Sequence, residues 1–208
     1  MENLNLILFI SIAIPLGLML LILEERARTD LFFLIIGLTV CLFCGELSTI
    51  LAQFIPFSFR FLTTNLTPIT EEVCKALPIL FYAFLYKPKR QQLLEASIAV
   101  GVGFAVLENA FLLASNLSAI SVTTGILRGF GAGTMHAQTT LAVGFGMSFV
   151  HTRRKLFGTG TVALLSVAIV FHSIYNNIVS TPHGYWGALL PIFLFVPLVL
   201  ALKKKKFI

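Results

Sequence analysis

Long apolar runs separated by short basic clusters restrict the fold of this chain more than any other feature. Each run is near the roughly 20 residues that an α-helix needs to cross a hydrocarbon core. The runs cover residues 4–23, 31–52, 64–86, 92–115, 121–150, 157–180 and 187–202. Only 12% of the residues are charged and the mean hydropathy is +0.93, which is unlike a soluble domain. We therefore predict an all-α, polytopic membrane helix bundle of about seven transmembrane helices.

The basic residues predict the orientation of this bundle. Of the 15 lysines and arginines, 12 fall in four clusters: Arg26 and Arg28; Lys87, Lys89 and Arg90; Arg153, Arg154 and Lys155; and Lys203 to Lys206. Basic loops stay on the cytoplasmic side, so we expect the N-terminus outside and the C-terminus inside, with Arg60 as the one exception. Membrane topology therefore explains the net charge of +6, and nucleic-acid binding is not needed to explain it.

The same count predicts the domain organisation and the location. Seven helices use most of the chain, so residues 1–208 are expected to form a single integral membrane domain in the cell membrane. The first run has no basic segment before it and no cleavage signature after it, which favours a retained helix over a signal peptide. Cys41, Cys44 and Cys74 lie inside predicted helices, and we interpret them as small apolar filler.

Ionisable and amide side chains inside the predicted helices are the candidates for function. A charge near the centre of a spanning helix costs roughly 2.5–3.5 kcal/mol on insertion scales, so it marks a functional or a paired site. Counted inward from the outer helix ends, five such residues on four helices lie about 10–12 Å deep; they are Glu71, Glu72, Glu108, Arg128 and His172. His136 lies deeper on the same helix as Arg128. A shared depth predicts one polar cavity nearer the outer face.

Spacing along the helices predicts which of these residues act together. Glu71 and Lys75 are four residues apart and share a helical face, so we expect them to form an ion pair. His172 and Asn176 have the same spacing and can point at one ligand. Glu108 and Arg128 either line the cavity or satisfy each other as a structural pair. Glu46 either pairs or lines the cavity.

This set of side chains predicts the hydrolysis of a bond. A carboxylate can take a proton from water and return it to a leaving amine, while a histidine orients the water or stabilises the oxyanion. Two adjacent buried carboxylates need not both ionise, so one can serve as the acid. Alternatively, His136, His172 and a glutamate supply the two nitrogens and one oxygen of a catalytic zinc site. Both versions stay open from the residues alone.

Four segments together resemble the motifs of PrsW-type intramembrane proteases. They are Pro68–Lys75 (PITEEVCK), Phe104–Asn109 (FAVLEN), the helix from Arg128 to His136 with Gly144 eight residues later, and Phe171–Asn176 (FHSIYN). Their order and their placement on separate helices agree with the family over about residues 30–180. The wider group of CAAX-prenyl-protease and bacteriocin-processing membrane proteins is similar in its double glutamate and two later histidines.

The resemblance implies cleavage of a membrane-anchored protein, typically an anti-sigma factor, near its extracytoplasmic side. It implies catalytic roles for Glu71, Glu72, His136 and His172. It implies supporting roles at the site for Lys75, Glu108, Asn109, Arg128 and Asn176. The family is often classed as metallopeptidases, whereas the prenyl-protease relatives suggest activation without metal. If a divalent metal such as zinc is used, we expect His136, His172 and Glu108 to hold it.

Two other classes of function also fit buried polar groups. A proton-coupled small-molecule transporter would place Glu, His, Arg and Asn in the bilayer, but these groups share one level and do not trace a path to the cytoplasmic face. A non-catalytic membrane scaffold would tolerate them only as structural pairs. Replacing Glu71 or Glu72 by Gln separates these functions, because hydrolysis would vanish while a scaffold would keep its role. The substrate and the oligomeric state remain open.

Overall fold

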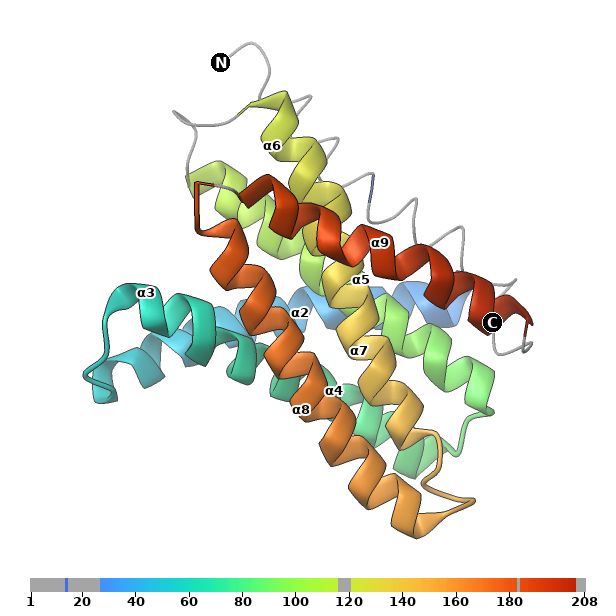
Figure 1. Ribbon diagram of the computed structural model, residues 1–208. Helices are drawn as coiled ribbons and strands as arrows, with labels where there is room; N and C mark the ends of the chain where they lie inside the picture. Colours follow the sequence, from blue (N-terminus) through green and yellow to red (C-terminus); the bar gives the residue numbers. More distant parts are fainter. Residues whose placement is uncertain (1–13, 15–26, 116–120, 183, 205–208) are drawn as a thin grey trace.

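The computed structural model describes residues 14, 27–115, 121–182 and 184–204 of the chain, and within these ranges it contains helices and turns but no strand (Figure 1). The predicted all-α class is therefore confirmed. Apart from residue 14, the first predicted span at 4–23 lies outside the described residues. The described elements are α2 (Ala27–Phe54), α3 (Phe59–Phe61), η1 (Leu62–Leu66), α4 (Thr67–Tyr86), α5 (Arg90–Ser115), α6 (Val122–Leu127), η3 (Arg128–Ala132), α7 (Gly133–Met147), α8 (Arg154–Val179) and α9 (Gly184–Lys204).

Three of these helices are long and apolar enough to cross a membrane. They are α2 from Thr29 onward, α5 and α8, and they correspond to the predicted spans at 31–52, 92–115 and 157–180. The predicted span at 121–150 is one continuous helical segment, in which α6, η3 and α7 follow each other from Val122 to Met147. The count of seven spans and the orientation of the termini stay predictions.

The segment between the second and third predicted spans is partly helical, and the helix begins at Phe59, before the predicted start of the third span at 64. This helix continues through η1 into α4. Ser58 is the N-cap, and its hydroxyl accepts a hydrogen bond from the backbone N–H of Phe61 at 3.3 Å. A serine in this position satisfies one of the free amides of a first helical turn. The end of α2 and α3 lie at one side of the bundle, at the left of Figure 1.

Helix α5 is the centre of the bundle. In its most apolar stretch 72% of the residues are buried, against 28% in α2 and 11% in α8. α5 packs against α2 and α7, and α7 packs against α8. Glycines permit these close approaches, since a Cβ at Gly103 would overlap the carbonyl oxygen of Leu34 on α2. On the face toward α7, a Cβ at Gly101 would overlap the carbonyl oxygen of His136.

A Gly103→Ala substitution is expected to destabilise the bundle by about 1–3 kcal/mol, because the added methyl group must push α5 away from the backbone of α2. The matched control is Gly45→Ala on α2, where a Cβ meets no atom within 4 Å. Thermal unfolding of the two purified variants in the same detergent measures the difference. Equal unfolding temperatures would contradict the close approach of these helices.

Candidate active site

Lys75 on α4 is a buried cation that joins two other helices to its own. It is 0% exposed, and its Nζ donates to Oε1 of Glu72 at 2.7 Å and to Nδ1 of His136 on α7 at 2.9 Å. The ammonium group also lies 4.9 Å from the centre of the Phe104 ring on α5. An ammonium group can only donate hydrogen bonds. Nδ1 of His136 therefore accepts, and the ring proton of neutral His136 is on Nε2.

The predicted pair between Glu71 and Lys75 was wrong, because Lys75 pairs with Glu72 instead. Adjacent helical residues point about 100° apart, so only one of the two glutamates can share the face on which Lys75 reaches His136. That glutamate is Glu72, which is 1% exposed. Glu71 is turned to another side, where it lines a cavity.

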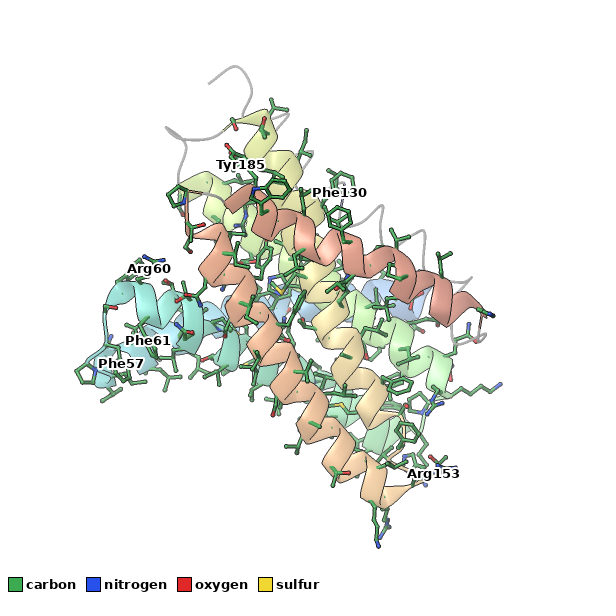
Figure 2. All side chains as sticks on the ribbon, viewed as in Figure 1. Phe57, Arg60, Phe61, Phe130, Arg153 and Tyr185 are labelled. Carbon is green, nitrogen blue, oxygen red and sulfur yellow. The ribbon has the colours of Figure 1, made fainter. Side chains whose placement is uncertain are left out.

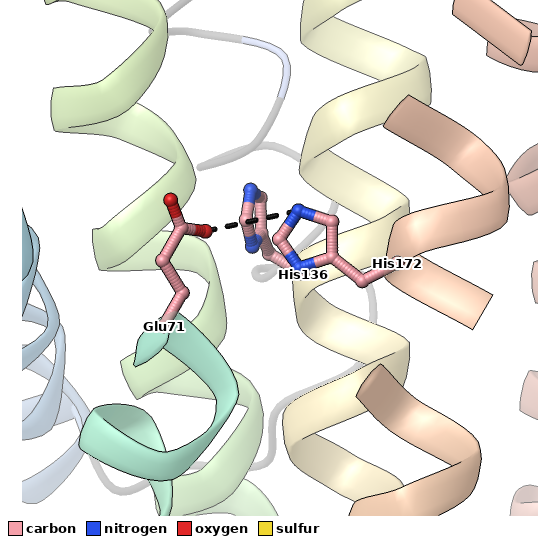
Figure 3. A group of neighbouring side chains, drawn as sticks. All are labelled: Glu71, His136 and His172. Atoms are coloured by element: carbon pink, nitrogen blue, oxygen red, sulfur yellow. Dashed lines mark ion pairs between the residues drawn. The ribbon is translucent and has the colours of Figure 1, made fainter. Parts of the chain in front are cut away.

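His172 links α8 to α4. Its Nδ1 donates to Oε1 of Glu72 at 2.8 Å, so the same oxygen receives both Lys75 and His172. The other ring nitrogen, Nε2, then presents a lone pair, and it lies 3.7 Å from Oε2 of Glu71 (Figure 3). The rings of His136 and His172 meet edge to face, with centroids 4.9 Å apart.

The second half of the cluster consists of Glu108, Asn109 and Arg128. The first half consists of Glu71, Glu72, Lys75, His136 and His172. Oε2 of Glu108 on α5 accepts from Nε2 of His136 at 2.9 Å and lies 3.6 Å from a terminal nitrogen of Arg128. The possible pair of Glu108 with Arg128 is thus present. Nε of Arg128 donates to Oδ1 of Asn109 at 2.9 Å, and Nδ2 of Asn109 donates back to the carbonyl oxygen of Arg128 at 3.3 Å. Buried Asn109 therefore holds both the side chain and the backbone carbonyl group of Arg128.

The backbone of α5 places these groups on one face. Gly101, Phe104 and Glu108 follow at helical spacing. Gly101 contacts the backbone of His136, the Phe104 ring lies 5.0 Å from its imidazole, and Glu108 binds its Nε2. Sequence reasoning did not include Phe104 among the site residues, although it opens one of the four quoted segments.

Two π-helical turns border the site. η1 comes just before the glutamates of α4, and η3 begins at Arg128 itself. Single π-turns within longer helices are frequent at functional sites. Sequence reasoning missed both turns, since an extra residue in a helical turn leaves no clear mark on an apolar pattern.

A cavity of about 580 Å³ lies beside the cluster. Glu71, Glu108, Arg128 and His136 line it, as does Glu46 from α2. The rest of the cluster is absent from its wall, namely Glu72, Lys75, Asn109 and His172. The cluster therefore has one layer facing the cavity and another behind it.

The wall of this cavity also contains the predicted Asn176 and several hydroxyl residues that were not predicted. Asn176 lines it, but its amide donates to the carbonyl oxygen of Thr63 at 3.4 Å and not to the cluster. Six serine and threonine residues also line it, namely Ser48, Thr49, Thr63, Thr64, Thr67 and Ser180. Hydroxyl side chains commonly bond to their own helix, so the sequence offered no signal for these. The three cysteines pack with Phe104 in an apolar cluster, which confirms their prediction as filler.

The donor atoms of Glu71, His136 and His172 suit a divalent metal ion. One ligand atom from each lies within 4.8 Å of the others, and two nitrogens with one oxygen is a set found in catalytic zinc sites. Buried Oε2 of Glu71 has no hydrogen-bond partner among the described residues. Nδ1 of His172 is held by a carboxylate, as is usual for metal-binding histidines. To bind an ion through Nε2, His136 would have to give up its bond to Glu108, the glutamate that we had expected among the ligands, and move its ring proton to Nδ1.

Comparison with known proteins finds one family for this chain. The model of the PrsW family of intramembrane metalloproteases matches residues 25–202. This match includes all the residues of the cluster. No curated protein and no solved structure matches the chain.

Proposed function

Because the chain belongs to the PrsW family of intramembrane metalloproteases, and is thus a membrane-embedded hydrolase, we propose that it crosses the cell membrane several times and cuts a membrane-anchored protein. The bond lies near the extracytoplasmic side, and an anti-sigma factor is the substrate class that we infer. The observation that carries this proposal is the meeting of Glu71, His136 and His172 beside the cavity of about 580 Å³.

In this proposal the two adjacent glutamates have different roles. Glu71, His136 and His172 would hold a divalent ion such as zinc, which when bound supplies a Lewis acid for a carbonyl group and for water. Glu72 holds Nδ1 of His172 and so aims its Nε2 toward Glu71. Lys75 contacts Nδ1 of His136; if Nε2 of His136 held the ion, the ring proton would be on Nδ1 and Lys75 would accept it as a neutral amine. Both of these residues act from behind the wall of the cavity.

Glu108 and Arg128 both face the cavity, so we assign proton transfer and the stabilisation of negative charge to them. We assign to Glu108 the acceptance of a proton from water, whose oxygen forms the new bond to the peptide carbonyl carbon. The C–N bond then breaks, and the proton moves from Glu108 to the leaving amine. Arg128, fixed by Asn109, stabilises the negative charge that develops on the carbonyl oxygen.

Removal of divalent metal is expected to abolish cleavage, and added zinc is expected to restore it. The assay reconstitutes the full chain with single-pass candidate substrates, including anti-sigma-type proteins, and maps the cut by mass spectrometry. Bound metal is counted independently by elemental analysis, in which His172→Ala is expected to lose it. Cleavage that survives a chelator would remove the metal from this proposal.

A further inference from the structure

A second cavity lies at the far end of α4 from the candidate active site. It has a volume of about 690 Å³ and is lined by the α4–α5 connection and by the segment between α7 and α8. Sixteen residues separate Glu71 from Lys87, which places this cavity about 24 Å along the helix from the cluster. It is therefore distinct from the site described above.

The described residues that line this cavity include several cations and no carboxylate. Lys87, Lys89, Arg90 and Arg153 contribute positive charge (Arg153 is labelled in Figure 2). Arg90 is fixed in place, because its Nε donates to Ser148 Oγ at 3.0 Å and its guanidinium lies 4.5 Å from the ring centre of Phe149. Such an arrangement favours an anion.

Two long helices also begin at this cavity. α5 starts at Arg90 and α8 starts at Arg154, directly after Arg153 in the wall. A helix start carries partial positive charge and unpaired backbone N–H groups, which adds to the attraction for an anion. The N-cap of α8, Arg153, offers no side-chain hydrogen bond to these N–H groups. A ligand with several acceptor oxygens, such as a phosphate group, matches these donors.

Apolar side chains next to the cations indicate that this phosphate carries hydrocarbon chains. Leu93, Phe149 and Val150 form part of the cavity wall. Phe84 and Leu85 on the adjoining end of α4 are 49% and 71% exposed. Free inorganic phosphate would gain nothing from such a surface, whereas a lipid can place its headgroup on the cations and its chains along the apolar helices.

We propose that this cavity is a binding site for the phosphate headgroup of an anionic membrane lipid. Lys89 and Arg153 contact the phosphate oxygens from opposite connections, and Lys87 adds charge at the rim. The bound lipid thereby joins the start of α5 to the start of α8, two of the helices that carry the candidate active site.

Native mass spectrometry of the full chain in detergent tests this proposal with defined lipids. We expect one phosphatidylglycerol molecule to stay bound while phosphatidylcholine dissociates. The triple substitution Lys87→Asn, Lys89→Gln and Arg153→Gln is expected to weaken phosphatidylglycerol binding by about 100-fold. Asn is chosen at position 87 because that residue has a positive φ of 47°, which Asn tolerates.

The matched control removes the same charge from residues that do not line the cavity, by Arg154→Gln, Lys155→Gln and Lys204→Gln. Equal loss of lipid in both triple variants would show general surface attraction and overturn the proposal. Displacement of the lipid by micromolar inorganic phosphate would overturn the assignment to lipid. If the first triple variant fails to fold by circular dichroism, Lys89→Gln and Arg153→Gln are measured singly, and unchanged binding in both overturns the proposal.

Discussion

Glu71→Gln is expected to lower kcat/KM for peptide cleavage by at least about 100-fold. Changing a residue that only supports a metal ligand costs up to about 100-fold, and the loss of a proposed ligand is expected to cost at least as much. Glu71 faces the cavity, and its Oε2 lies 3.7 Å from Nε2 of His172. An amide keeps the size of the side chain and removes its charge. The variant is therefore expected to fold like the parent and to lose its bound metal.

The matched control for this experiment is Glu46→Gln. Glu46 lines the same cavity from α2, but it is not part of the bonded cluster. Its replacement removes an equal charge from the wall and is expected to change kcat/KM by less than about tenfold, since a single exposed charge contributes little. Equal losses in the two variants would show that cleavage depends on the charge of the cavity and not on Glu71.

Lys75→Met is expected to lower the free energy of unfolding by about 3–5 kcal/mol, the usual cost of leaving one partner of a buried ion pair alone. Met has a similar length, but it provides no donor for Glu72 or for Nδ1 of His136, which Lys75 binds at 2.7 and 2.9 Å. Unfolding of the purified variant in detergent measures this loss.

The double variant Lys75→Met with Glu72→Gln tests the cause of the loss. Removing both charges leaves no unpaired ion, so we expect the double variant to be more stable than Lys75→Met alone. A double variant whose loss equals the sum of the two single losses would mean that these groups do not interact, in conflict with their contact.

The sequence predicted those parts of the fold that depend on local pattern. Apolar length and basic clusters located α2, α5 and α8. The pattern did not predict the helix start at Ser58, because that position depends on a single hydroxyl cap within a short polar stretch. The π-turn at Arg128 was also missed, since it changes the register of a helix without changing its composition.

For the candidate site, the sequence indicated which residues meet but not which atoms bind. Estimated depth brought Glu71, Glu108 and His172 to one level, and the structure gathers them in one cluster. The partner of Lys75 could not be predicted, because both glutamates are within reach of it along one helix. The choice depends on where α7 places His136, which is a tertiary contact.

One oxygen of Glu72 receives Lys75 and also His172, which comes 100 residues later in the chain. The two helices that meet at this oxygen are therefore synthesised at different times. Until the helix of His172 has been made, the histidine that faces Glu71 is missing and the proposed metal site is incomplete. A nascent chain that ends before α8 therefore lacks one of the three side chains proposed to hold the metal ion.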